Sequence, residues 1–233
     1  LRKEVSMKVR IKFSKEGPVK FIGHLDVMRY FQKAIRRAEI DIAYSSGFSP
    51  HQIMSFAAPL SVGHTSIGEY FDVELNSLDS IEALTARLNE VMVDGIRILD
   101  AKILDEKEKN AMASVAAADY LVSFSDRLIL PPDWKDKLDA FYRQDQIAVT
   151  KKTKKGEKEL DLKAGIYQLE IRDSSVYMLL DAGSGSNLKP GFVLETFFET
   201  LNITLPEFPF RVHRLETYKR EEYGSLMPLI ANG

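Results

Sequence analysis

The sequence predicts an α+β protein made of two similar halves, each with the element order β-α-β-β-α-β. Apolar and polar residues alternate along several short segments, as they do in half-buried strands. Segments with apolar residues at helical spacing separate these strands, and the same order of elements returns after residue 118. This is the order of the ferredoxin-like fold. We therefore expect two tandem ferredoxin-like domains, at 7–104 and 119–222, joined by a linker at 105–118.

The first half opens with a strand at 7–13, where Val9 and Ile11 fall on the same side. A helix follows at 24–38, because its apolar residues recur every three or four positions. Ser80 is a good N-cap for the second helix, since its hydroxyl can accept a bond from a free main-chain N–H group. The other expected elements are extended segments at 40–44 and 52–57 and strands at 69–75 and 96–104.

The second half repeats this order with one addition. Its β-rich stretch at 147–181 contains two turns, one at Lys154-Lys155-Gly156 and one at Asp173-Ser174-Ser175. That is one hairpin more than the ferredoxin-like order needs, so we expect an inserted β-hairpin. The other expected elements are a strand at 119–125, a helix at 131–141, a helix near Pro190 and a strand at 210–218. We expect residues after Glu222 to be peripheral.

Composition excludes several kinds of protein. Of the 233 residues, 45% are hydrophobic and 28% are charged, which is typical of a globular protein with a core. The sequence contains no cysteine, so disulfides, iron–sulfur clusters and a cysteine nucleophile are excluded within this chain. No apolar run approaches the roughly 20 residues that span a bilayer. We expect a cytoplasmic protein with no membrane partner, and Met7 as its natural start after a short upstream remnant.

The net charge of −2 supplies no global field that attracts nucleic acid, so any such binding depends on local patches. Arg29, Lys33, Arg36 and Arg37 share one face of the first predicted helix, at about 100° per residue. This stripe suits phosphates, because each contact displaces counterions. The alternative, which stays open, is a solvated surface with ion pairs to nearby acids such as Asp26.

A second basic cluster lies on the predicted inserted hairpin. Its members are Lys151, Lys152, Lys154, Lys155 and Lys158. One interpretation is a surface for nucleic acid or an acidic partner. The other is an edge hairpin that lysines protect against aggregation. A Gly- and Ser-rich loop at 183–191 precedes the last helix, but it lacks a Walker or dinucleotide motif, and we expect a plain connector.

The densest polar cluster lies in the first half. We single out His24, Tyr44 and His51 as candidate catalytic residues, because a histidine near a hydroxyl can act as a general acid or base. The loop residues grouped with them are Ser45, Ser46, Gly47, Phe48, Pro50 and Glu69. The histidines lack a compact metal-ligand motif, so we predict neither a metal nor another cofactor. The structural alternative is that His24 packs at the helix start while His51 holds the loop.

Several of these segments resemble an uncharacterised bacterial family of radical-SAM-linked proteins. The resemblance rests on 21–29, on Arg36-Arg37-Ala38, on 44–51, on 55–60 and on Gly68-Glu69-Tyr70. Later matches are Lys154-Lys155-Gly156 with Asp161, and Asn187-Leu188-Lys189-Pro190. Proteins of this family are encoded beside a radical SAM protein or form its C-terminal domain. The resemblance therefore implies a radical SAM enzyme as the partner, which would carry the cluster that this cysteine-free chain does not hold.

The chain is also distantly similar to CRISPR precursor-RNA endoribonucleases, which use tandem ferredoxin-like domains and a histidine near the first helix. That family's glycine-rich loop precedes its last strand, whereas residues 201–211 here contain no glycine. Our leading expectation is a non-catalytic subunit that binds RNA and presents it to a radical SAM enzyme. The alternatives are a metal-independent endoribonuclease that uses His24 or His51, and a protein-docking module without affinity for nucleic acid.

Overall fold

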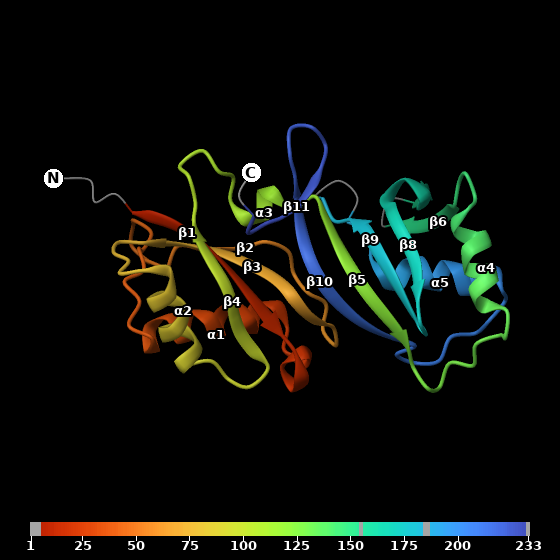
Figure 1. Cartoon of the computed structure of the whole chain (residues 1–233), viewed down its shortest axis with the longest axis horizontal. Helices are drawn as coiled ribbons and strands as arrows, with labels where there is room; N and C mark the ends of the chain where they lie inside the picture. Colours follow the sequence, from red (N-terminus) through yellow and green to blue (C-terminus); the bar gives the residue numbers. More distant parts are fainter. Residues whose placement is uncertain (1–5, 154–155, 184–186, 232–233) are drawn as a thin grey trace. The chain divides into compact units, whose positions relative to one another are not determined.

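A computed structural model describes residues 6–153, 156–183 and 187–231, with residues 151–153 and 156–158 described by their main chain only (Figure 1). The protein is mixed α+β, as the sequence predicts. Its contacts divide it into two compact units. The first unit contains Leu1–Val115 and Glu216–Gly233, and the second contains Ala116–Leu215.

The first unit has an antiparallel sheet with two helices on one face. Its strand order is β4-β1-β3, and both β2 and the second half of β10 lie beside β3. Its elements are β1 (Met7–Lys15), η1 (Gly17–Phe21), α1 (His24–Arg37), β2 (Met54–Phe56), β3 (Thr65–Leu75), α2 (Ile81–Glu90), β4 (Ile96–Ile103), α3 (Ala111–Ser114), β10 (Phe210–Arg220) and β11 (Leu226–Pro228).

The core of this unit lies between the sheet and α1 and α2. Val9, Ile11 and Phe13 of β1 are buried in it, which confirms the predicted alternation. Phe13 meets Phe31 of α1 edge to face, with ring centroids 4.7 Å apart, a favoured arrangement of aromatic rings. The hydroxyl of Ser80 accepts a 3.0 Å hydrogen bond from the N–H of Ala83, so the predicted N-cap of α2 is confirmed.

The opposite face of this sheet is covered by α3 and the C-terminal segment, and a buried ion pair holds them there. Arg10 is fully buried and pairs with both carboxylate oxygens of Asp72, at 2.9 and 3.1 Å. Its guanidinium also donates to the carbonyls of Lys109, at 2.8 Å, and Leu229, at 3.1 Å. Leu229 is itself fully buried. The expectation that residues after Glu222 are peripheral is therefore wrong, because Leu229 is part of the core of this unit and its carbonyl is a partner of the buried Arg10.

The second unit repeats the sheet-and-helices arrangement, with the strand order β10-β5-β9-β8. A separate two-stranded sheet, β6-β7, matches the predicted hairpin, although Lys154 and Lys155 at its turn lie outside the described residues. The elements of the second unit are β5 (Ala117–Phe124), α4 (Trp134–Tyr142), β6 (Ala148–Thr153), β7 (Gly156–Asp161), η2 (Lys163–Gly165), β8 (Ile166–Arg172), β9 (Ser175–Asp181), α5 (Pro190–Thr200) and the first part of β10.

The structure refines one expectation about local structure and corrects another. Residues 40–44 and 52–57 are extended, but among them only Met54–Phe56 forms a strand, joined by isolated bridges at Ile42 and Tyr44. The segment at 105–118, predicted as a linker, contains α3 and the first two residues of β5. Ala111 within it is fully buried, and its N–H group donates a 2.6 Å hydrogen bond to the carboxylate of Asp72.

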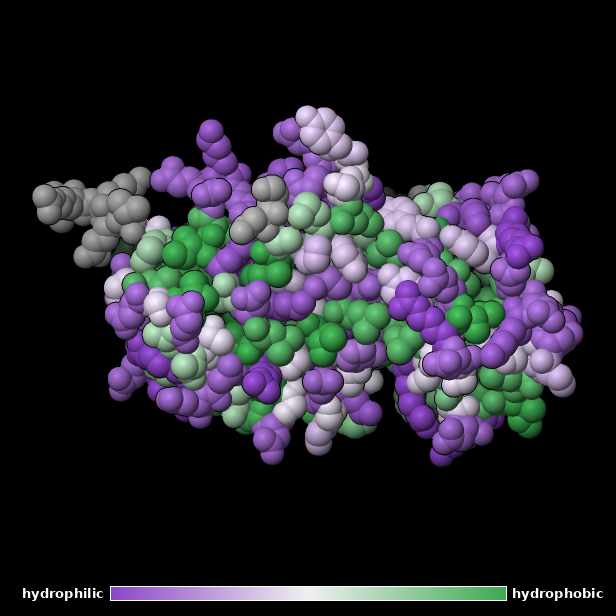
Figure 2. All heavy atoms as spheres, in the orientation of Figure 1, coloured by the Kyte–Doolittle hydropathy of each residue, from purple (hydrophilic) through white to green (hydrophobic). Residues whose placement is uncertain are grey.

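Hydrophilic residues cover most of the face seen in Figure 2, with hydrophobic residues between them. Within the part of the chain that the structure describes, no helix has both the length and the apolar composition to cross a bilayer.

Candidate nucleic-acid interface

Helix α1 has one buried face and one basic face. Val27, Phe31, Ala34 and Ile35 are buried against the sheet. Arg29, Lys33, Arg36 and Arg37 are all exposed, as the predicted spacing requires. We call these four residues the basic face of α1.

Within the described parts of the chain, most of the charge of the basic face is not paired with carboxylates. Arg29 forms an ion pair of 3.2 Å with Asp26, and both side chains are largely exposed. Arg36 donates instead to the main-chain carbonyl of Gln32, at 3.2 Å. Arg37 donates to the carbonyl of Val91, at 3.1 Å. A neutral carbonyl leaves the positive charge of a guanidinium uncompensated, so these contacts orient the cations without cancelling their field.

Residues 44–52 form an arch that is closed at its foot. The N–H of Ser45 donates to the carbonyl of His51, at 2.8 Å, and the N–H of His51 donates to Ser45 Oγ, at 3.1 Å. A third hydrogen bond, of 2.8 Å, joins Ser45 Oγ to His51 Nδ1. Tyr44 and Gln52 form a bridge below them. His51 thus holds the loop, which was the structural alternative for this residue.

The arch carries two exposed aromatic side chains. Tyr44 is 51% exposed, and Phe48, near the middle of the arch, is fully exposed. Gly47 beside it has a φ of 114°, a conformation that only glycine adopts without strain. The sequence indicates Tyr44 and Phe48 because they lie in a segment rich in polar residues. It does not indicate that the side chain of Phe48 is fully exposed.

The arch is attached to α1 next to the basic face. The side-chain amide of Gln52, which is buried, donates a 3.3 Å hydrogen bond to the main-chain carbonyl of Gln32. The same carbonyl accepts the bond from Arg36. The foot of the arch and one cation of the basic face therefore share a single acceptor. In addition, the sequence from 42 to 68 contains no aspartate or glutamate, so no carboxylate within this stretch opposes an anion.

His24 lies at the start of α1, away from the arch. Its ring meets Phe56 of β2 edge to face, with centroids 5.6 Å apart, whereas Gln52 contacts Gln32. Those contacts are eight residues apart on the helix, or about 12 Å at the helical rise of 1.5 Å per residue. The structure therefore does not bring His24 together with Tyr44 and His51 as the predicted catalytic group. Local periodicity in the sequence does not report this separation.

His24 borders a small pocket that also contains Lys15 and Glu69. Burial lowers the pKa of His24, and the nearby charge of Lys15 acts in the same direction while Glu69 opposes both. Burial likewise lowers the pKa of Lys15, and Glu69 opposes this shift. Lys15 Nζ donates to the carbonyl of Ile22, at 2.7 Å. The pocket has a volume of about 10 Å³, close to the least that one water molecule needs, so it has no room for a nucleotide.

Glu69 differs from its predicted place, and Lys15 is a buried residue that the sequence did not indicate. Glu69 was grouped with the loop residues, but it lies within β3 and is buried, because its side chain falls on the face of the sheet that α1 covers. Lys15 is almost fully buried and was not singled out by the sequence. The carbonyls of Lys20 and Ile22, which accept hydrogen bonds from Lys15 Nζ, and the nearby carboxylate of Glu69 explain how a lysine is tolerated there.

The lysine cluster lies in the second unit. Lys151 and Lys152 are in β6 and Lys158 is in β7, with Lys151 paired opposite Lys158. Lys154 and Lys155 lie outside the described residues. Among the described residues, no group of three or more histidine, cysteine, aspartate or glutamate side chains is placed to hold a metal ion.

Comparison with known families places the sequence in one of them. Residues 8–190, which are most of the chain, match the family described as "Uncharacterized protein conserved in bacteria", DUF2344. The chain belongs to this family. A comparison with curated proteins gives no match. The DUF2344 match covers both the basic face of α1 and the arch, so both lie within the conserved domain.

Proposed function

We propose that this DUF2344 protein is a non-catalytic subunit that binds RNA through the basic face of α1. The observation that carries the proposal is the position of four exposed cations beside an arch without acidic residues. Three of these cations have no carboxylate partner among the residues that the structure describes. Such a surface attracts phosphates even though the whole chain has a net charge of −2.

Binding to phosphates is favoured because it releases condensed counterions from the nucleic acid. Two of the cations, Arg36 and Arg37, are held by main-chain carbonyls, so these two side chains lose little conformational freedom when a phosphate arrives. The pocket at His24 is too small for a nucleotide, and His24 lies apart from His51. These features favour binding over RNA cleavage.

The strand orders support a tandem ferredoxin-like fold. The first unit has the order β4-β1-β3-β2 and the second has the order β10-β5-β9-β8, with β6-β7 as an insertion. Many ferredoxin-like RNA-binding domains stack bases on the open face of their sheet. In the first unit that face is covered by α3 and the C-terminal segment, which Arg10 holds in place. This directs RNA to α1 and the arch.

The proposed catalytic partner is a radical SAM enzyme in the bacterial cytoplasm. This part of the proposal rests on the resemblance to radical-SAM-linked proteins. This sequence contains no cysteine, so the iron–sulfur cluster of such an enzyme would be held outside it. The lysines at 151–158 are proposed as a second contact with the same RNA, on the basis of their charge.

The test is a titration of the purified protein against cellular RNA at several salt concentrations. We expect affinity to fall steeply as salt rises, and the RNA to be recovered intact. The triple variant Arg29→Gln, Lys33→Gln, Arg36→Gln removes three cations and leaves Arg37 bonded to Val91. Its slope of log K against log salt should be shallower by about 2, since each contact with a single strand contributes roughly 0.7.

The matched control is the triple variant Lys135→Gln, Lys137→Gln, Arg143→Gln, which removes three exposed cations at α4. It should keep the slope of the wild-type protein. Equal losses in the two triple variants would mean that binding follows net charge alone and would contradict a site on α1. Cleaved RNA in the presence of EDTA would contradict the non-catalytic proposal.

A further inference from the structure

We propose that Phe48 stacks on an unpaired base, so that the RNA is bound as a single strand. This inference rests on the proposed function, because the phosphates of the same strand would contact the basic face of α1. The inference specifies the form of the RNA. The basic face alone does not, since cations attract the phosphates of duplexes and single strands alike.

Phe48 is held in a position where no described residue covers it. The arch is closed by three hydrogen bonds between Ser45 and His51 and anchored to α1 through Gln52. Burying a phenylalanine side chain stabilises a protein substantially, so a phenylalanine that a preformed arch keeps fully exposed is available to a ligand. Little ordering is needed when that ligand binds.

The surroundings of Phe48 fit a nucleotide better than an acidic or a purely apolar partner. Ser46 and Ser49 beside it are exposed and can donate hydrogen bonds to base edges or phosphate oxygens. The arch lies within a stretch of 27 residues, 42–68, that has no acidic side chain. Arg36 shares the carbonyl of Gln32 with Gln52 at the foot of the arch, so a cation lies beside the loop that carries Phe48.

An aromatic ring beside a basic groove is the usual arrangement for single strands. Each base offers a flat face, so stacking needs no particular sequence, while the cations follow the backbone. The bases of a duplex are already stacked on one another and offer no free face to a protruding ring. The arch therefore predicts a preference for loops or other unpaired segments of an RNA.

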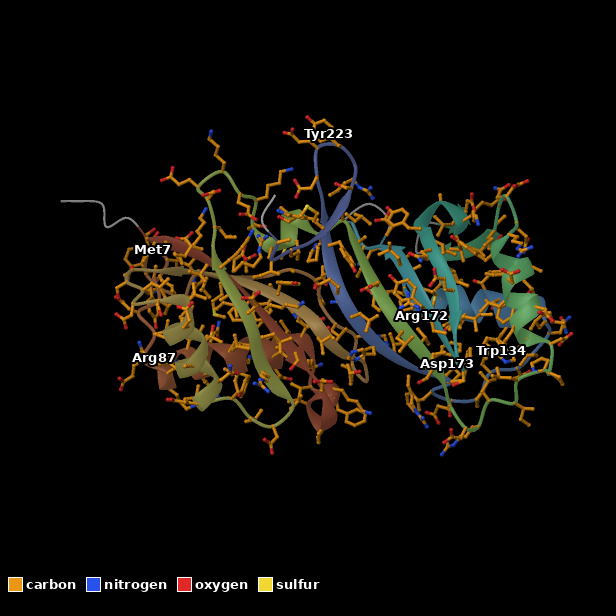
Figure 3. The ribbon with its side chains drawn as sticks, viewed as in Figure 1. Met7, Arg87, Trp134, Arg172, Asp173 and Tyr223 are labelled. Atoms are coloured by element: carbon orange, nitrogen blue, oxygen red, sulfur yellow. The ribbon has the colours of Figure 1, made fainter. Side chains whose placement is uncertain are left out.

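The experiment compares binding of an oligouridine strand and of an RNA duplex of equal length. Phe48→Ala should weaken binding of the single strand by about tenfold and leave both the salt dependence and duplex binding unchanged. The matched control is Tyr223→Ala. Tyr223 is almost fully exposed at the turn between β10 and β11 (Figure 3), but Glu221 and Glu222 precede it. This variant should bind like the wild-type protein.

A second readout is the fluorescence of the variant Phe48→Trp. The chain has one other tryptophan, Trp134, which is buried. The tryptophan fluorescence that this variant shows in addition to that of the wild-type protein therefore comes from the arch. Stacking on uracil should quench it as the strand is added. Salt-dependent binding of oligouridine without quenching, together with an unchanged affinity of Phe48→Ala, would overturn this inference and leave the proposed function intact. Absence of salt-dependent binding of any RNA to the wild-type protein would overturn both.

Discussion

The side-chain amide of Gln52 donates a 3.3 Å hydrogen bond to the main-chain carbonyl of Gln32, and so fixes the foot of the arch to α1. The same carbonyl accepts a 3.2 Å bond from Arg36. Two separate features, a basic helix face and an aromatic loop, thus meet at one atom. The proposed RNA-binding surface depends on this meeting.

Gln52→Met should weaken RNA binding while hardly changing the stability of the fold. The buried Oε1 of Gln52 has no hydrogen-bond partner in the structure, so replacing the amide by an apolar side chain of similar volume removes an unsatisfied group as well as a hydrogen bond. We expect the free energy of unfolding to change by less than about 1.5 kcal/mol. The arch loses its anchor, so we expect RNA affinity to fall severalfold, mainly through faster dissociation.

Urea unfolding and stopped-flow dissociation of oligouridine measure the two effects separately. Arg36→Lys is a useful companion variant, because it keeps the charge on the basic face and leaves Gln52 bonded to Gln32. An unchanged dissociation rate in Gln52→Met would show that the arch needs no anchor on α1.

Arg10→Met should be among the most destabilising substitutions in the first unit. It leaves the buried carboxylate of Asp72 without its guanidinium and removes the donor to the carbonyls of Lys109 and Leu229. Breaking one partner of a buried ion pair costs about 3–5 kcal/mol, which chemical denaturation can measure.

The control for Arg10→Met is Arg143→Met, which breaks an ion pair with Asp139 on an exposed helix surface. We expect that variant to lose less than about 1 kcal/mol. Equal losses would mean that the Arg10–Asp72 pair does not hold the C-terminal segment on the sheet. Limited proteolysis should also release residues after Glu222 more readily from Arg10→Met.

The free energy of unfolding should decrease as the pH decreases, and part of this decrease should depend on His24. Burial lowers the pKa of its ring below the ordinary value of 6.5, with Lys15 acting in the same direction and Glu69 opposing. Between the folded-state value and 6.5, the unfolded chain binds more protons at this residue than the folded one. The contribution of His24 is therefore complete above the unfolded pKa and is lost as the pH falls toward the folded one.

His24→Gln removes this titration. The free energy of unfolding of the variant, measured in urea from about pH 7 down to about pH 5, should vary less steeply than that of the wild-type protein. Parallel curves for the two proteins would contradict the assignment of this pH dependence to His24.

The sequence predicts the features that depend on local patterns. The alternation of Val9 and Ile11 identifies β1, because a strand turns successive side chains to opposite faces. The spacing of Arg29, Lys33 and Arg36 identifies the exposed face of α1 for a similar reason, since residues three and four apart lie on the same side of a helix.

Features that join distant residues could not be predicted in this way. Arg10 meets Asp72 and Leu229, which lie 62 and 219 positions further along the chain, and no local pattern indicates such a contact. The sequence gives the polar residues of the arch, yet it does not show that Ser45 and His51 close its foot. It also does not show that His24 lies apart from them, because that separation depends on how residues 52–56 run along α1.

The proposed function depends most directly on where RNA contacts the protein. The measurement is photocross-linking of the wild-type protein to RNA that contains 4-thiouridine, followed by identification of the modified peptides. We expect cross-links in the peptides that cover α1 and the arch, with Phe48 and Tyr44 among the modified residues. Cross-links confined to other peptides, such as the one that contains α4, would contradict binding through the basic face of α1.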